Sequence, residues 1–404
     1  MLLKKLFKYF LPFELLILIV AVSCRNETVN RKEPINLYED PLDSIAVVWA
    51  PDIREAVCEA RLVQSDKGLI LKGETDIPEA KDSITGFLKA RNVNFTDSLI
   101  LLPDTAVIKE PWGLVNVSVC NIRSSGTYIS EMVSQALMGT PVKILKQERG
   151  WYLIQTPDRY LGWVDSDAVV TFSATEHQVW KLSPRIIYLE KTGDVYGNRT
   201  GKKIVSDIVA GCILRLLSSD NLYYEILFPD GRKGYIDRKE AIPFKEWADM
   251  SVPEGKNLLK TAESFMGIPY LWGGTSVKGF DCSGFVKTVY FLNGVILARD
   301  ASLQFRHGIR IRRSGYPDSL KTGDLLFFGS VRNGRPHPTH VGMYTSDTEF
   351  IHSSGMVRVN SLDSTRNDFS RRRRDTFIGV RRIDGAEEDK GIQRISSHSW
   401  YFNN

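Results

Sequence analysis

Cys282 is the residue whose surroundings point most directly to chemistry. It follows an irregular stretch that contains Gly273, Gly274 and Gly279, and it stands just before the apolar-periodic run FVKTVYFL. This pattern predicts a glycine loop followed by a helix that begins at the cysteine. At a helix N-terminus, unpaired N–H groups and the helix dipole stabilise a thiolate and can donate to an oxyanion. We therefore predict that Cys282 is a nucleophile, the alternative being a buried structural cysteine.

A nucleophilic thiol needs a base within hydrogen-bond reach, and the base needs a partner that orients it. The chain has six histidines, of which His340 and His352 are separated by the length of a hairpin. His340 begins the predicted strand THVGMYTS and His352 lies in the next one, so strand pairing places the two rings side by side. We predict His340 as the base and His352 as the residue that fixes its tautomer. Structural histidines are one alternative, and a zinc site, for which no fourth ligand is evident, is another.

An α+β unit over residues 251–385 must position these side chains. The sequence predicts a helix at NLLKTAESFMG, the helix that carries Cys282, and three strands at KTGDLLFFGS, THVGMYTS and EFIHSSG. The strands form a short antiparallel sheet after the cysteine helix, and residues 386–404 are predicted to be a C-terminal tail. Chemistry of this kind needs no metal and no other cofactor.

The middle third of the chain contains an internal repeat. The residues of one copy match those of the other at a constant sequence offset. Trp151 corresponds to Tyr223 and Gly162 to Gly234, and the Pro-Asp turns and the segments GWVD and GYID align in the same way. Each copy predicts a small β-barrel, over residues 111–175 and 176–247. Both copies resemble bacterial SH3-like domains.

The N-terminal third contains an export signal and a small α/β region. Residues 1–24 combine three lysines, an apolar stretch and the sequence Ala-Val-Ser-Cys, which resembles the lipobox of bacterial lipoproteins. We predict lipid attachment at Cys24, with an ordinary signal peptide as the alternative. Residues 25–44 are predicted to be a polar tether. Residues 45–110 show strand alternation, one helical segment and a further strand, without a catalytic cluster.

Composition excludes some function classes. The 404 residues carry 53 basic and 48 acidic side chains, and part of the excess lies in the leader and in the run Arg371 to Arg374. Nucleic-acid binding is therefore not indicated, and the arginine run is interpreted as a solvated segment in preference to a phosphate grip. Cys58, Cys120 and Cys212 lie among apolar residues, which favours free thiols, although one disulfide remains possible in an oxidising compartment.

Five segments in order, YLWGG, DCSGF, GDLLFF, HVGMY and FIHSSG, identify a family resemblance. Residues 251–385 resemble the NlpC family of papain-like cysteine peptidases. The resemblance implies a Cys-His-His triad on Cys282, His340 and His352. It also implies that the Tyr270 hydroxyl and the Cys282 backbone N–H stabilise the oxyanion.

The combination of SH3-like domains with this catalytic unit is similar to the γ-D-glutamyl-L-diamino-acid endopeptidases. Their substrates are murein peptides with a free amino terminus, and the resemblance implies the same substrates here. A carboxylate and a hydroxyl in a closed pocket would hold an ammonium and exclude an acylated terminus. The implied substrate-binding residues are Glu131, Tyr160, Asp281, Ser283 and Ser302.

The sequence thus predicts an exported, lipid-anchored cysteine peptidase on the periplasmic side or the cell surface. A second hypothesis is a wall-binding protein in which the SH3-like pair acts and the catalytic unit is vestigial. A third is an amidase or acyltransferase, because a triad determines the mechanism and not the leaving group.

Overall fold

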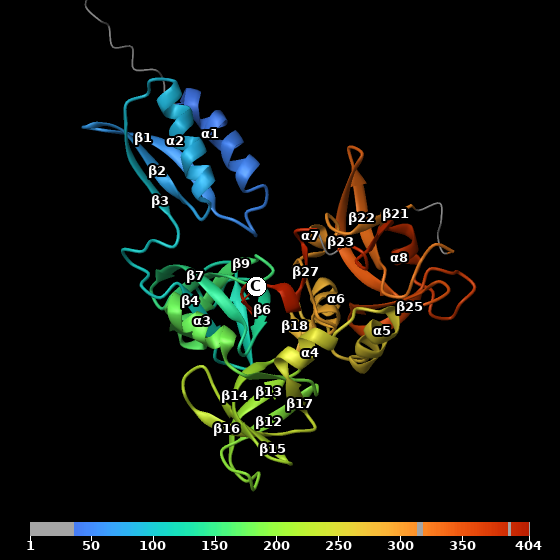
Figure 1. Ribbon diagram of the computed structural model, residues 1–404. Helices are drawn as coiled ribbons and strands as arrows, with labels where there is room; N and C mark the ends of the chain where they lie inside the picture. The colour runs from blue at the N-terminus through green and yellow to red at the C-terminus, as the bar shows by residue number, and fades with distance from the viewer. Residues whose placement is uncertain (1–35, 313–317, 387–388, 404) are drawn as a thin grey trace, which may run out of the picture.

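The computed structural model describes residues 36–312, 318–386 and 389–403, which form an N-terminal unit, two barrels and a catalytic unit (Figure 1). The export signal, Cys24 and the first part of the expected tether lie outside the described residues. None of the helices in the described ranges is long and apolar enough to cross a membrane.

The N-terminal unit is a three-stranded sheet with both helices on one face (Figure 1). Strands β1 and β2 are antiparallel, while β2 and β3 are parallel and are connected through α2. The segment 36–44, expected as tether, lies in helix α1 instead, because Tyr38 and Leu42 are one turn apart and are buried against Leu71 and Ile84. The elements are α1 Asn36–Trp49, β1 Cys58–Ser65, β2 Gly68–Thr75, α2 Pro78–Ala90 and β3 Phe95–Leu101.

The two barrels have the same topology, as the internal repeat predicts. The strand order is β10-β4-β7-β8-β9-β5-β6 in the first and β17-β11-β14-β15-β16-β12-β13 in the second, so equivalent strands occupy equivalent places. Helix α3, Ala174–Leu182, connects them. The first barrel comprises β4 Trp112–Val115, β5 Val119–Arg123, β6 Met132–Leu137, β7 Pro141–Glu148, β8 Trp151–Gln155, β9 Leu161–Asp165 and β10 Val169–Phe172. The second comprises β11 Arg185–Tyr188, β12 Thr192–Tyr196, β13 Ile204–Val209, β14 Ile213–Ser219, β15 Tyr223–Leu227, β16 Lys233–Asp237 and β17 Ala241–Pro243.

The catalytic unit packs helix α6 against a six-stranded sheet of order β21-β26-β22-β23-β24-β25. Phe285, Val286 and Val289 of the helix are buried together with Phe327 and Val341 of the sheet. The helices are α4 Phe244–Met250, α5 Gly255–Ser264, α6 Cys282–Phe291, α7 Ala301–Gln304 and α8 Arg371–Asp375. The strands are β18 Thr275–Ser276, β19 Gly279–Phe280, β20 Val295–Leu297, β21 Ile309–Ile311, β22 Leu325–Arg332, β23 Arg335–Tyr344, β24 Glu349–Ser354, β25 Met356–Ser361, β26 Phe377–Arg382 and β27 Ile392–Arg394.

The C-terminal segment, expected to be a tail, is a packed part of the fold. Strand β27 pairs with β20 of the catalytic unit, and Ile395 and Tyr401 are buried with Trp180 and Phe244. Nη2 of Arg185 donates to the carbonyl oxygen of Tyr401 at 2.9 Å. The segment packs on the fold because the side chains at 392, 395 and 401 are largely apolar. Their exposure to water in a free tail would cost free energy.

Candidate active site

Helix α6 begins at Cys282, and the residue before it caps the helix. Oδ1 of Asp281 accepts from the Gly284 backbone N–H at 2.7 Å, which satisfies one unpaired donor of the first turn. A Cβ atom on Gly284 would lie 2.0 Å from the carbonyl oxygen of Gly274, so only glycine lets the helix start sit this close to the preceding loop. The loop and the cap together hold the Cys282 side chain, which is 7% exposed, at the floor of a cavity.

The surroundings of Cys282 favour a neutral thiol in the free protein. Burial, followed by the adjacent Asp281 carboxylate, raises the pKa of Cys282 to about 11, although a backbone hydrogen bond from Val341 and the Arg299 charge lower it. Sequence reasoning predicted a thiolate stabilised by the helix N-terminus. Burial of the sulfur and the neighbouring carboxylate work against that stabilisation in the free protein. A nucleophilic role for Cys282 would therefore require a base that takes the proton of the thiol.

The histidines and Asn360 form a directed hydrogen-bond chain. Asn360 Nδ2 donates to the carbonyl oxygen of Asp368 at 2.8 Å, so its Oδ1 faces His352 Nε2, 2.9 Å away, as an acceptor. His352 Nε2 then carries the proton and its Nδ1 accepts from His340 Nε2 at 2.7 Å. In a neutral ring this leaves Nδ1 of His340 unprotonated and able to take a proton.

The surroundings of both histidines favour the neutral ring. Burial, followed by the Arg373 charge, holds the pKa of His340 well below its ordinary value. Burial also lowers the pKa of His352 to about 3. Arg373 itself is buried on helix α8, whereas its three arginine neighbours are exposed, so the solvated interpretation of that run is wrong at this one position.

A β-bulge places His340 beside the cysteine helix. Phe328 of β22 pairs with His340, but Gly329 pairs with Pro338, which leaves Thr339 as an extra residue in β23. Bulges of this kind redirect a side chain near an active site. The following residue, Val341, forms the backbone hydrogen bond to the Cys282 sulfur, so this part of β23 lies at the helix N-terminus.

The cavity above Cys282 has a volume of about 340 Å³ and brings together residues from three parts of the chain. Such a volume suits a small peptide segment. The lining includes all of the predicted substrate-binding residues and the predicted oxyanion donor, namely Glu131, Tyr160, Asp281, Ser283, Ser302 and Tyr270. His340 and His352 lie beneath the surface, and the flanking Pro338 and Thr339 reach the lining.

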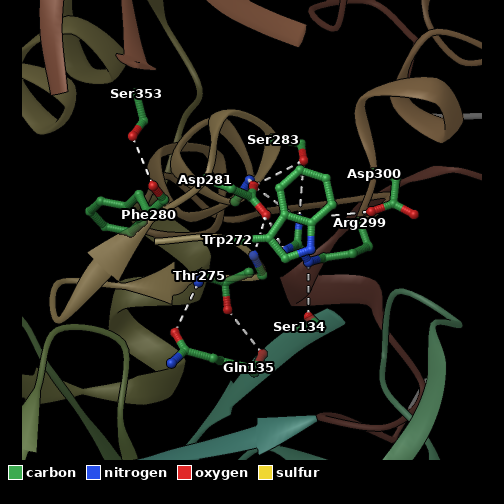
Figure 2. A network of polar contacts seen from close by, with 12 residues as sticks. Ser134, Gln135, Trp272, Thr275, Phe280, Asp281, Ser283, Arg299, Asp300 and Ser353 are labelled. Atoms are coloured by element: carbon green, nitrogen blue, oxygen red, sulfur yellow. Dashed lines mark hydrogen bonds and ion pairs between the residues drawn. The ribbon is translucent and has the colours of Figure 1, made fainter. Parts of the chain in front are cut away.

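The first barrel supplies one side of the cavity. Trp272 Nε1 donates to Glu131 Oε1 at 2.6 Å, and the Tyr160 hydroxyl donates to Asp300 Oδ2 at 3.2 Å. The barrel is fixed against the glycine loop by Gln135, whose Oε1 accepts from the Thr275 backbone N–H at 3.0 Å (Figure 2). These contacts join the carboxylate and hydroxyl of the barrel to the thiol in one cavity.

Asp281 is held by a buried arginine that sequence reasoning missed. Arg299, 1% exposed, donates to both oxygens of Asp281, to Ser283 Oγ at 3.0 Å and to Ser134 Oγ at 3.0 Å (Figure 2). Asp281 Oδ2 also accepts from the Gly273 backbone N–H at 3.1 Å. The Asp281 carboxylate therefore lines the cavity while both of its oxygens are already hydrogen-bonded within the protein.

The sequence analysis missed three further residues of the cavity: Arg54, Trp272 and Asp300. Trp272 lies inside the YLWGG segment and Asp300 precedes the predicted Ser302 by two positions, so proximity to known motifs could have suggested both. Arg54 lies in the N-terminal unit, for which the sequence predicted no role.

Family comparisons agree with this geometry. A model described as the NlpC/P60 family matches residues 267–376, and a model described as the bacterial dipeptidyl-peptidase Sh3 domain matches residues 122–169. The chain is 30% identical over 235 residues to the Gamma-D-glutamyl-L-lysine dipeptidyl-peptidase of Bacillus cereus, covering 56% of this chain and 68% of that protein. It is also 30% identical over 266 residues to Dipeptidyl-peptidase 6 of Lysinibacillus sphaericus, covering 62% and 91%. The chain belongs to the NlpC/P60 family of cysteine peptidases.

A solved structure supports the NlpC/P60 fold. The crystal structure of an NlpC/P60 family protein from Bacillus cereus superposes with a TM-score of 0.57 at 24% identity, covering 67% of this chain and 99% of that one. The predicted resemblance and the α+β fold class are confirmed. Residues before 122, including Arg54, lie outside both family models.

Proposed function

We propose that this NlpC/P60 peptidase hydrolyses the γ-D-glutamyl-L-diamino-acid bond of murein peptides that carry a free N-terminal L-alanine. One observation carries the proposal: Glu131 and Tyr160 of the first barrel line the same cavity as the nucleophile Cys282. The names of the relatives from Bacillus cereus and Lysinibacillus sphaericus point to the same class of dipeptide-releasing reaction.

The first half of the reaction forms an acyl-enzyme. His340 Nδ1 takes the proton of the Cys282 thiol as the sulfur attacks the γ-carbonyl carbon. The negative oxygen of the tetrahedral intermediate accepts hydrogen bonds from the Cys282 backbone N–H and the Tyr270 hydroxyl. When the C–N bond breaks, the leaving amine takes the proton from His340, and the L-Ala-γ-D-glutamyl group remains on the sulfur as a thioester.

The second half releases the dipeptide. Water enters after the diamino acid leaves, and His340 Nδ1 takes its proton as the oxygen attacks the thioester carbon. Collapse of this intermediate returns the proton to the sulfur and frees the new carboxylic acid. His352, held by Asn360, keeps the His340 ring in the tautomer required in both halves.

The barrel residues determine which terminus can enter. Glu131 is a carboxylate on the cavity lining, and no lysine, arginine or histidine in the described ranges lies within ion-pair distance of it. An ammonium group is the natural partner for such a carboxylate, with the Tyr160 hydroxyl nearby. An N-acylated terminus has no positive charge to pair with Glu131, and its acyl group would clash with the barrel. Cut stem peptides are therefore better substrates than intact murein.

Export and anchoring complete the proposal. The signal pattern at 1–24 supports secretion, and the Ala-Val-Ser-Cys sequence supports lipid attachment at Cys24, with the enzyme facing the periplasm or the cell surface. Murein peptides are available in that compartment.

The test is cleavage of two matched peptides. Purified protein is incubated with L-Ala-γ-D-Glu-diaminopimelate, free and N-acetylated, and the products are identified by mass spectrometry. We expect release of L-Ala-γ-D-Glu from the free peptide only, and no release by Cys282→Ala. Cys58→Ala, at a half-buried thiol of the N-terminal unit, is the control and should retain activity. Equal cleavage of both peptides, or activity in Cys282→Ala, would contradict the proposal.

A further inference from the structure

Three arginines of the catalytic unit stand close to the two active-site histidines. Arg358 is on β25, directly opposite His352 of β24. Residues opposite each other on antiparallel strands share one face of the sheet, so Arg358 lies on the same face as His352. Arg372 and Arg373 are on the short helix α8. The function proposed above gives none of the three a role in binding.

Arg373 is held at a definite place beside the reacting groups. Its Nη2 donates to Ser354 Oγ at 3.3 Å, and its guanidinium lies 5.7 Å from the centre of the Phe328 ring. Phe328 is the strand partner of His340. The carbonyl oxygen of the residue after Ser354 accepts from the Tyr270 backbone N–H at 2.9 Å. Arg373 is thus connected through one neighbour each to the expected base and to the expected oxyanion donor.

The positive charge of this cluster reaches the reacting groups. After burial, Arg373 and then Arg372 lower the pKa of His340. Burial, followed by repulsion from Arg372, lowers the pKa of Arg373 itself to about 10, whereas Cys282 and Tyr270 act in the opposite direction. An anion placed here would relieve the repulsion among the arginines.

No carboxylate of the described residues balances the cluster. Arg371 and Arg374, on the same helix, both contact Asp375. By contrast, no aspartate or glutamate in the described ranges lies within ion-pair distance of Arg358, Arg372 or Arg373.

The missing counter-ion matters most for Arg373, which is only 8% exposed. A buried charge without a partner is costly, and buried charges are usually paired. A guanidinium has five N–H donors, and the Ser354 contact uses one of them. None of the other Arg373 nitrogens is among the fully buried atoms without a partner, so they reach the molecular surface. They can therefore donate to a ligand.

The leaving half of the substrate must lie near these arginines. In the proposed reaction, His340 gives its proton to the amine of the diamino acid, so that residue lies beside His340 when the bond breaks. The amino-terminal half is on the barrel side of the cavity, where Glu131 and Tyr160 lie. Arg372 and Arg373 act on His340 without belonging to the lining of that cavity. They are therefore available to the leaving residue.

We propose that Arg373, assisted by Arg358 and Arg372, binds a carboxylate of the diamino acid that leaves. The inference rests on the proposed function, because it concerns the residue on the far side of the bond that is cut. The carboxylate is either the free α-carboxylate of a terminal diamino acid or the side-chain carboxylate of diaminopimelate. Guanidinium groups pair with either one through charge-assisted hydrogen bonds. An amide in the same place has no charge and is bound less well.

The test compares four peptides that share the L-Ala-γ-D-Glu half. The leaving residues are L-Lys, L-Lys α-carboxamide, diaminopimelate α-carboxamide and diaminopimelate with both distal carboxylates amidated. Release of L-Ala-γ-D-Glu by the wild-type protein is measured on the plateau of the pH profile. We expect a free carboxylate to raise kcat/KM by about tenfold or more, mainly through KM.

The pattern of rates identifies the carboxylate that is bound. An advantage of L-Lys over its amide assigns the α-carboxylate, and an advantage of the singly over the doubly amidated diaminopimelate peptide assigns the side-chain carboxylate. Equal kcat/KM on all four peptides would overturn the inference while leaving the proposed function intact. Cleavage of none of them would contradict both.

Variants assign the preference to the cluster. In Arg373→Met we expect the acid-to-amide ratio to fall toward one, because only the acid loses affinity, and Arg373→Lys should recover part of it. A change in the pKa of His340 affects acid and amide alike and leaves the ratio unaltered. Arg358→Met, at an exposed position, should lower the ratio in the same direction without disturbing a buried site.

The matched control is Arg374→Met. Arg374 follows Arg373 on α8 but is paired with Asp375, so its loss should leave the ratio unchanged. A purely structural role of Arg373 would lower activity on acid and amide equally. An unchanged ratio in Arg373→Met or in Arg358→Met, or an equal fall in Arg374→Met, would overturn the proposal.

Discussion

At the scale of single residues, the directions of the hydrogen bonds decide which nitrogen of His340 is free to act as a base. The Asn360 amide faces Asp368 with its nitrogen, so its oxygen fixes the proton of His352 on Nε2. That proton in turn leaves Nδ1 of His340 as the basic nitrogen. In the proposed mechanism His340 takes the proton of Cys282 during attack, so the rate should depend on the pKa of His340.

The pH profile should reflect the buried arginine next to these rings. His340 acts as a base only when neutral, and burial together with Arg373 lowers its pKa, so activity should fall only well below pH 6.5. Arg373→Met removes a nearby positive charge and should raise the pKa of His340. We expect the acid limb of kcat/KM to move to higher pH, measured on the free murein peptide.

Helix α8 offers a matched control for this measurement. Arg371 lies on the same short helix with its side chain 80% exposed, and it makes no contribution to the pKa shift of His340. Arg371→Met should leave the acid limb in place. An acid limb that moves to lower pH in Arg373→Met, or moves equally in both variants, would contradict the prediction.

Sequence reasoning could single out Cys282, His340 and His352 as candidates because cysteines and histidines are few and their local patterns are specific. Arg299 and Asp300 could not be predicted in the same way, since arginine and aspartate are common on any surface. Burial distinguishes them, and burial follows from packing between distant segments. The desolvation that raises the pKa of Cys282 cannot be seen from its place at a helix start either.

At the scale of elements, the start of α6 packs closely against the glycine loop that precedes it. The loop returns its backbone to the helix so closely that Gly284 has no room for a side chain. The same loop is attached to the first barrel through Thr275 and Gln135. The position of Cys282 therefore depends on both contacts.

Gly284→Ala should misplace the nucleophile. A Cβ atom 2.0 Å from the Gly274 carbonyl oxygen must push the helix start and the loop apart. Displacement by about 1 Å lowers kcat by about a hundredfold in such sites. Steady-state kinetics on the free peptide measures the loss.

Gly86 in helix α2 provides the control for an added methyl group. A Cβ atom there meets nothing within 4 Å, so Gly86→Ala should keep full activity and gain about 0.5 to 1 kcal/mol of stability from helix propensity. If Gly284→Ala turned over the peptide as fast as wild type, the close packing of α6 on the glycine loop would not determine the position of the Cys282 thiol.

At the scale of the whole molecule, the C-terminal segment joins three units. Strand β27 pairs within the catalytic unit, His398 Nε2 contacts the Pro157 carbonyl oxygen of the first barrel at 3.2 Å, and Tyr401 packs beside Trp180 at the barrel junction. This role could not be predicted from the sequence, because a few apolar residues after a charged stretch also fit a tail. The barrels were easier to predict, since a repeat requires each copy to fold alike.

Removing the Tyr401 ring should weaken the assembly. Tyr401 is 1% exposed, and deletion of a buried aromatic ring costs about 3 kcal/mol or more. We expect Tyr401→Ala to lower the urea midpoint of the transition that includes the barrels and the catalytic unit. Asn403→Ala, at an exposed position nearby, is the control. An unchanged midpoint in Tyr401→Ala would show that the segment does not hold the units together.

The cavity walls come from positions as far apart in the chain as Arg54, Glu131 and Ser302, whereas Cys282, His340 and His352, the proposed catalytic residues, all belong to one unit. Bond cleavage and peptide choice can thus change independently over evolutionary time. Exchange of an upstream unit, or a shift of a few degrees in how it docks, would redirect the enzyme to another muropeptide without touching the sulfur or either imidazole.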